Sequence, residues 1–183
     1  MKNNFVLGLA VVALAVTSAL AGMKNPMVGG HEMYPTKNIL ENAVNSADHT
    51  TLVVAVKAAG LVDTLAGAGP FTVFAPTNEA FAKLPAGTVD TLLKPENKQL
   101  LTKVLTYHVV AGRVSAADLK KMIQHGKGTA ELTTVAGGKL WAMEKDGHIV
   151  LQDEKGGIST VTIPNVFQSN GVIHVVDTVV MPN

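Results

Sequence analysis

The segment Phe71–Phe81, FTVFAPTNEAF, decides the fold that we expect for this chain. Its first five residues, Phe71–Ala75, are mostly β-forming and lie between a Gly-Pro pair and Pro76, which is typical of a short strand. Side chains alternate between the faces of a strand, and both faces of this one carry apolar residues, so we expect it to lie inside a sheet. Thr77 follows the proline and is placed to cap a short helix that completes the segment.

Helical patterns surround this strand on both sides. The predicted helices span residues 38–45, 51–59, 61–65, 95–106 and a stretch that opens at residue 115. The clearest of them, at 95–106, carries one apolar stripe formed by Leu100, Leu101, Val104 and Leu105. The last opens with Ser115 and Asp118 in capping-box spacing, ahead of the apolar residues Leu119, Met122 and Ile123.

Beyond these helices the sequence changes to short β-forming runs. The predicted strands span residues 139–144, 148–152, 160–163 and 171–176. Asp146-Gly147 separates the first two and is a strong signal for a hairpin. Helices first and strands later, with little alternation between them, favour an α+β fold in a single domain.

The first 35 residues differ in character from the rest. Residues 1–21 combine a short basic start, an uncharged run from Phe5 and an Ala-x-Ala end, which is typical of a signal peptide cleaved after Ala21. A membrane anchor is the competing interpretation, although the run falls short of the roughly 20 residues that a bilayer requires. Residues 22–35 contain Gly and Pro without an apolar period, so we expect a flexible lead-in followed by a domain at 36–181. We therefore expect a secreted or periplasmic protein with no stable membrane insertion after cleavage.

Composition excludes several classes of protein. The chain has no cysteine, which rules out thiol catalysis and cysteine-ligated metals. Its six histidines lie at least 17 residues apart, and no metal-binding, hydrolase or phosphate-loop motif is present. Loss of Lys2 with the signal peptide leaves 14 basic and 14 acidic residues, so a nucleic-acid partner is not expected. We expect no cofactor and no enzymatic activity.

Three segments together resemble the signature of the fasciclin-type domain. They are FTVFAPTNEAF at 71–81, LTYHVV at 105–110 and NGVIHVVDTVVM at 170–181, in the order of that family. The resemblance covers residues 36–181 and implies a β-wedge of two short sheets with helices packed on and around it. It also implies a non-enzymatic role in cell adhesion or in contacts with a surface or matrix protein, or with a glycan.

Tyr107 and His108 are the residues of this resemblance that we single out. In animal relatives a Tyr-His pair flanked by branched apolar residues is associated with adhesion, and Leu105, Val109 and Val110 match those flanks. We expect the pair to start an extended run, with its two side chains on opposite faces and one of them buried. The alternative is a core pair that locks helix to strand and matters for binding only indirectly.

The adhesive families carry a second motif shortly before the last strand, and this chain departs from it. Its counterpart is residues 163–167, where Asn165 stands in place of an acidic residue. That departure argues against an integrin contact through this segment. We interpret Pro164-Asn165 as a break between two strands and His174 as a neutral core histidine.

Other functions remain open alternatives. Met23, Met27, His31 and Met33 lie within 11 residues of the lead-in, and thioether and imidazole groups suit Cu(I), although a Met-rich tail without a ligand is the simpler interpretation. A small-molecule or lipid-binding protein of the cell envelope, with a pocket between sheet and helices, is a second alternative, and an unrecognised hydrolase is a third. We expect a monomer or weak self-association.

Overall fold

The computed structural model describes residues 24–183 of the 183-residue chain. The predicted signal peptide at 1–21 and Met23 lie outside the described residues. None of the helices within 24–183 has the length and apolar character needed to cross a membrane.

Seven strands within residues 24–183 follow the order β2-β1-β7-β6-β5-β4-β3. Their bounds are β1 Phe71–Pro76, β2 Val109–Ala111, β3 Thr129–Thr133, β4 Lys139–Lys145, β5 His148–Gln152, β6 Ile158–Gln168 and β7 Gly171–Val176. Strand β1 lies between β2 and β7, as its two apolar faces predicted, and pairs in parallel with β7. The remaining pairs are antiparallel.

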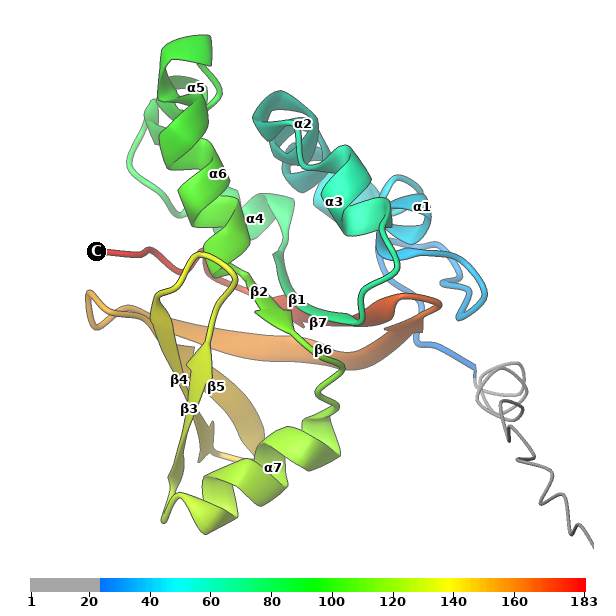
Figure 1. Ribbon diagram of the computed structural model, residues 1–183, viewed down its shortest axis with the longest axis vertical. Helices are drawn as coiled ribbons and strands as arrows, with labels where there is room; N and C mark the ends of the chain where they lie inside the picture. The colour runs from blue at the N-terminus through cyan, green and yellow to red at the C-terminus, as the bar shows by residue number, and fades with distance from the viewer. Residues whose placement is uncertain (1–23) are drawn as a thin grey trace, which may run out of the picture.

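The sheet is divided into two halves that share the long strand β6. Residues 158–160 of β6 pair with β5, whereas the stretch from Val161 to Gln168 pairs with β7. The halves β2-β1-β7-β6 and β6-β5-β4-β3 splay apart as the two arms of a wedge (Figure 1). Val110 of β2 also forms a bridge with Thr134, just after β3, so the ends of the strand order approach each other. The α+β wedge expected from the sequence is confirmed.

Seven α-helices within the described residues pack on this wedge. They are α1 Ile39–Ala43, α2 Thr50–Ala59, α3 Val62–Ala66, α4 Asn78–Ala82, α5 Thr88–Leu92, α6 Lys98–Tyr107 and α7 Ala116–His125. Single 3₁₀ turns at Ala47–His49 and Pro95–Asn97 precede α2 and α6. The predicted caps are present: the Thr77 hydroxyl accepts from the Ala80 N–H, and Ser115 and Asp118 form a complete capping box.

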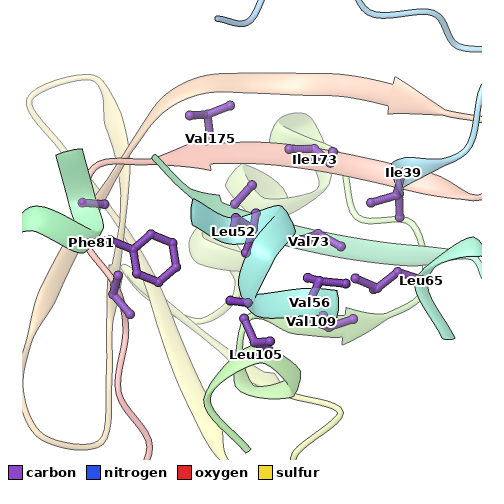
Figure 2. Close-up of a cluster of buried hydrophobic side chains, with 14 of the residues drawn as sticks. Ile39, Leu52, Val56, Leu65, Val73, Phe81, Leu105, Val109, Ile173 and Val175 are labelled. Carbon is purple, nitrogen blue, oxygen red and sulfur yellow. The ribbon is translucent and has the colours of Figure 1, made fainter. Parts of the chain in front are cut away.

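Two hydrophobic clusters lie on opposite faces of strand β1. Val73 and Ala75 belong to a cluster with residues of α1 to α6, whereas Phe74 belongs to a cluster with α7 and strands β3 to β5. Figure 1 shows the same division, with α1 to α6 on one side of the wedge and α7 on the other. Figure 2 shows side chains of α2 lying over the strands within the first cluster. Because side chains alternate along β1, one face of this strand packs into the first cluster and the other face packs into the second.

Several local predictions differ from the structure. Leu100 is 49% exposed and Met122 is 38% exposed, so each apolar stripe is narrower than predicted. The predicted break at Pro164-Asn165 is wrong, because β6 continues through it with two register shifts and a positive φ at Asn165. Strand β3 and helix α5 were not predicted.

The described part of the lead-in, residues 24–35, packs against the domain. Val28 and Met33 are buried in the same cluster as α1 and α2. The Asn25 side chain accepts from the Phe167 N–H at 2.8 Å and donates to the Phe167 carbonyl at 2.7 Å, as a further strand beside β6 would. A flexible lead-in was expected from the sequence, whereas residues 24–35 pack on the domain, because the side chains of Val28 and Met33 are buried over the sheet.

Asn170, in the turn between β6 and β7, ties that turn to the helices. Its amide nitrogen donates to the carbonyls of Leu65 at 2.8 Å and Gly67 at 2.7 Å. Its amide oxygen accepts from the N–H of Ile39 at 3.0 Å. One buried side chain therefore satisfies backbone groups at the start of α1 and the end of α3.

Candidate functional site

The residues singled out by the resemblance lie at the junction of α6 and β2, and all are buried. Leu105, Tyr107, His108, Val109 and Val110 are each at most 6% exposed. Tyr107 is the last residue of α6 and His108 is its C-cap, so the pair ends a helix and does not start a strand. Both side chains are buried, where one was expected.

Tyr107 fastens the helix to the second half of the sheet. Its hydroxyl donates to the carbonyl of Lys139, at the start of β4, and accepts from the N–H of Glu154 at 3.2 Å. Gly138 lies against the ring, where an added Cβ would come within 2.8 Å of a ring carbon. Burial raises the pKa of the Tyr107 hydroxyl to about 12, so the group stays protonated and able to donate.

His108 is a neutral imidazole with both nitrogens in use. Nδ1 lies 2.8 Å from the carbonyl of Val104 and donates to it, while Nε2 accepts from the N–H of Val180 at 3.2 Å. Burial lowers the pKa of His108 to about 4, because a charged ring would lose its contact with water. A protonated ring would also direct a second N–H at the Val180 N–H.

This arrangement favours a structural role for the pair. The side chains of Tyr107 and His108 face the interior, and their polar atoms are satisfied by four backbone groups. A partner that approaches the surface of this structure does not reach them. The pair instead joins α6 to β4 and to the C-terminal segment, which is the alternative that the sequence left open.

His174 and Asn165 form a second buried polar group. His174 is fully buried on β7, with Nε2 2.8 Å from the Val114 carbonyl and Nδ1 accepting from the Asn165 N–H at 3.2 Å. Burial lowers the pKa of His174, which agrees with the neutral core histidine expected. The Asn165 side chain accepts from the Ala116 N–H at 2.8 Å, so its amide oxygen stabilises the start of α7. Asn165 is thus used inside the molecule.

The described residues of the methionine-rich lead-in differ in their exposure to solvent. Met33 is 3% exposed and belongs to the hydrophobic core, whereas Met27 is 63% exposed and His31 is also on the surface. Within residues 24–183, no three or more His, Asp or Glu side chains lie close enough together to hold a metal ion.

An apolar cavity lies between the helices and the first half of the sheet. It has a volume of about 60 Å³ and is lined by residues of α1, α2, α3, α6, β1, β2, β6 and β7. Three buried polar residues, Ser46, His49 and His108, belong to its lining, and the Ser46 hydroxyl lies 2.8 Å from Nδ1 of His49. The sequence indicated a pocket between sheet and helices as an alternative but did not identify these residues, because a Ser and a His three residues apart carry no specific signal.

Comparison with known proteins places these features in a family. The profile described as Fasciclin domain matches residues 47–182. Protein sll1483 of Synechocystis sp. is 44% identical over 180 residues, which cover 98% of this chain and 92% of that protein. Cell surface glycolipoprotein MPB83 of Mycobacterium bovis is 41% identical over 122 residues, covering 67% of this chain and 48% of its own length.

A solved structure has the same fold at low sequence identity. It is the FAS1 domain pair from the insect cell adhesion molecule fasciclin I, with a TM-score of 0.69 and 21% identity. The match covers 78% of this chain and 50% of that one, as expected when one domain is compared with a pair.

Proposed function

The chain belongs to the fasciclin domain family, and we propose that it is an exported, non-enzymatic module that binds a cell-surface or matrix protein, or a surface glycan. The observation that carries this proposal is the 41% identity to a mycobacterial cell surface glycolipoprotein. The signal-peptide pattern of residues 1–21 supports export, and the sequence contains no cysteine that would join the module covalently to a partner.

Binding would take place on the outer surface of the wedge and not at the Tyr-His pair. Tyr107 and His108 would maintain the arrangement of α6, β2 and β4 on which the exposed surface rests. Affinity per domain would be weak, and several copies on one cell or matrix would raise it through effective concentration.

The test is binding of the fluorescently labelled protein to envelope preparations of the producing cells. We expect saturable binding that the unlabelled protein competes and that heat-unfolded protein does not show. Absence of saturable binding to envelope, matrix protein and glycan preparations would contradict the proposal, as would turnover of ester or glycoside substrates by the same preparation.

Tyr107→Phe separates a structural role from direct contact in that assay. Measured well below the melting temperature of the variant, its dissociation constant is expected to equal that of the wild type, because the hydroxyl faces the interior. A weaker dissociation constant in a fully folded variant would show that the pair contacts the partner.

Export is tested by fractionating the producing cells and determining the N-terminal residue of the protein that accumulates. We expect Gly22 at the N-terminus of a protein outside the cytoplasm. An intact Met1 in the cytoplasm would contradict this part of the proposal.

A further inference from the structure

Asn170 and Gly171 form the single Asn-Gly pair of the chain, where the turn after β6 meets β7. Asparagine is chemically labile, most of all before glycine, which has no side chain to hinder its own backbone nitrogen. In deamidation the Gly171 nitrogen loses its proton and bonds to Cγ of Asn170, the bond from Cγ to Nδ2 breaks, and ammonia leaves with that proton. Water then adds across one of the two C–N bonds of the cyclic imide, which leaves aspartate or isoaspartate at position 170.

The fold requires both members of this reactive pair. The amide nitrogen of Asn170 donates to the carbonyls of Leu65 and Gly67, and its amide oxygen accepts from the first N–H of α1. Gly171 lies so close to β1 that an added Cβ would collide with the carbonyl oxygen of Phe71. An aspartate cannot donate in this way, and a larger residue than glycine would push the strands apart. The labile pair therefore follows from the packing of the turn.

The folded structure protects the pair from the reaction. Asn170 is 6% exposed, and closing the ring would first break its three side-chain hydrogen bonds. Its main-chain carbonyl also accepts from the N–H of Phe71 at 3.0 Å. Gly171, which supplies the attacking nitrogen, is held between Phe71 of β1 and Gln168 of β6. Deamidation at Asn170 therefore requires the turn to open.

The product of deamidation no longer fits the turn. Aspartate would place an oxygen where the amide of Asn170 donates, so the Leu65 and Gly67 carbonyls would lose their donor and face a buried negative charge. Isoaspartate would lengthen the main chain by one carbon between the paired strands β6 and β7. We expect either product to lower the folding equilibrium constant by about 100-fold or more.

We propose that Asn170 is a deamidation site that converts unfolding of this domain into a lasting loss of stability. The folded state blocks the reaction, an open turn permits it, and the altered chain opens more readily afterwards. The chain has no cysteine, so no disulfide holds β6 and β7 against the helices while the turn is open. The rate in the native protein equals the rate in the unfolded chain multiplied by the fraction of time that the turn is open.

The test incubates the protein purified from its producing cells in mildly alkaline buffer, with and without guanidinium chloride. Mass spectrometry of the tryptic peptide 156–183 follows Asn170 together with Asn165, which precedes a valine. In denaturant we expect Asn170 to react ahead of Asn165, and in native buffer at least about 100-fold more slowly. Rates at Asn170 that agree within about tenfold between the two buffers would overturn the proposal.

The loss of stability is measured after the denaturant has been removed, by urea unfolding followed through the fluorescence of Trp141. We expect a population with a lower unfolding midpoint, equal in size to the fraction deamidated at Asn170. A deamidated population with the midpoint of the untreated protein would overturn the proposal.

Asn170→Asp isolates the effect of the product, and Asn45→Asp makes the same chemical change in the exposed turn after α1. We expect the folding equilibrium constant to fall about 100-fold or more in Asn170→Asp and to change by about twofold or less in the control. Equal stability of the two variants would contradict the proposal. An Asn170→Asp chain that does not fold agrees with it, and the two measurements on the wild-type protein remain decisive.

Discussion

The buried imidazole of His108 makes the stability of the fold depend on pH. Its pKa is about 4 in the folded protein, against an ordinary value of 6.5. Between these values the unfolded chain binds a proton that the folded protein does not, so stability falls as the pH falls. The contribution of His108 is complete above pH 6.5 and is progressively lost toward pH 4. From the two pKa values, the loss between pH 7 and pH 4 is about 3 kcal/mol.

The assay is urea unfolding at a series of pH values, followed by the fluorescence of Trp141, the only tryptophan of the chain. The comparison is His108→Gln, whose amide does not titrate in this range but can accept from the Val180 N–H. The variant is expected to be less stable at neutral pH, because the bond to Val104 is lost, and to depend less steeply on pH. His49, His174, Asp118 and Glu154 also have lowered pKa values and contribute to the remaining slope.

The test compares the change in unfolding free energy between pH 7 and pH 4 in the wild type with the same change in His108→Gln. The absolute free energies are not compared. A direct reading of the His108 pKa from its ring proton signals gives a second measure. If wild type and variant lose the same free energy over this range, or if the ring titrates near pH 6.5 in the folded protein, the reasoning is refuted.

Three further predictions concern single side chains and are measured by urea unfolding at pH 7. Tyr107→Phe is expected to cost about 1–3 kcal/mol, because two interior backbone groups lose the hydroxyl; an unchanged midpoint would contradict this. Asn170→Ala is expected to cost about 3 kcal/mol, because three backbone groups lose their partner; a cost below about 1 kcal/mol would show that water replaces the amide. Met33→Ala is expected to cost about 2–5 kcal/mol and the exposed control Met27→Ala about zero; equal effects would mean that the lead-in does not pack on the domain.

Features encoded by neighbouring residues could be predicted from the sequence. The alternation in β1 predicted a central strand, and the structure places its two faces in two different cores. The caps at Thr77 and Ser115 were predicted because a cap depends on three or four consecutive residues. The hairpin at Asp146-Gly147 was likewise predicted from local turn chemistry, and β4 and β5 pair across it.

Features that depend on distant partners could not be predicted in the same way. The burial of Val28 and Met33 depends on space beside α1 and the sheet, which a segment without an apolar period does not reveal. The exposure of Leu100 depends on which side of α6 meets its neighbours.

The candidate site shows the same limit. Tyr107 and His108 were singled out from the sequence, but their position at the end of a helix was not predicted, and only one of the two was expected to be buried. The cavity near His49 combines residues from eight helices and strands far apart in the sequence, so no local pattern encodes it.

Strand β6 has a consequence for how the domain opens. Because β6 pairs with β5 through its first residues and with β7 through the rest, separating the arms of the wedge would disturb the backbone hydrogen bonds that β6 forms with both strands. Amide protons on β5 and β7 should therefore exchange with solvent in one concerted event of equal free energy, and not as two independent subdomains. A molecule bound to one arm would then slow amide exchange in the other arm as well, because the two arms share the single strand β6.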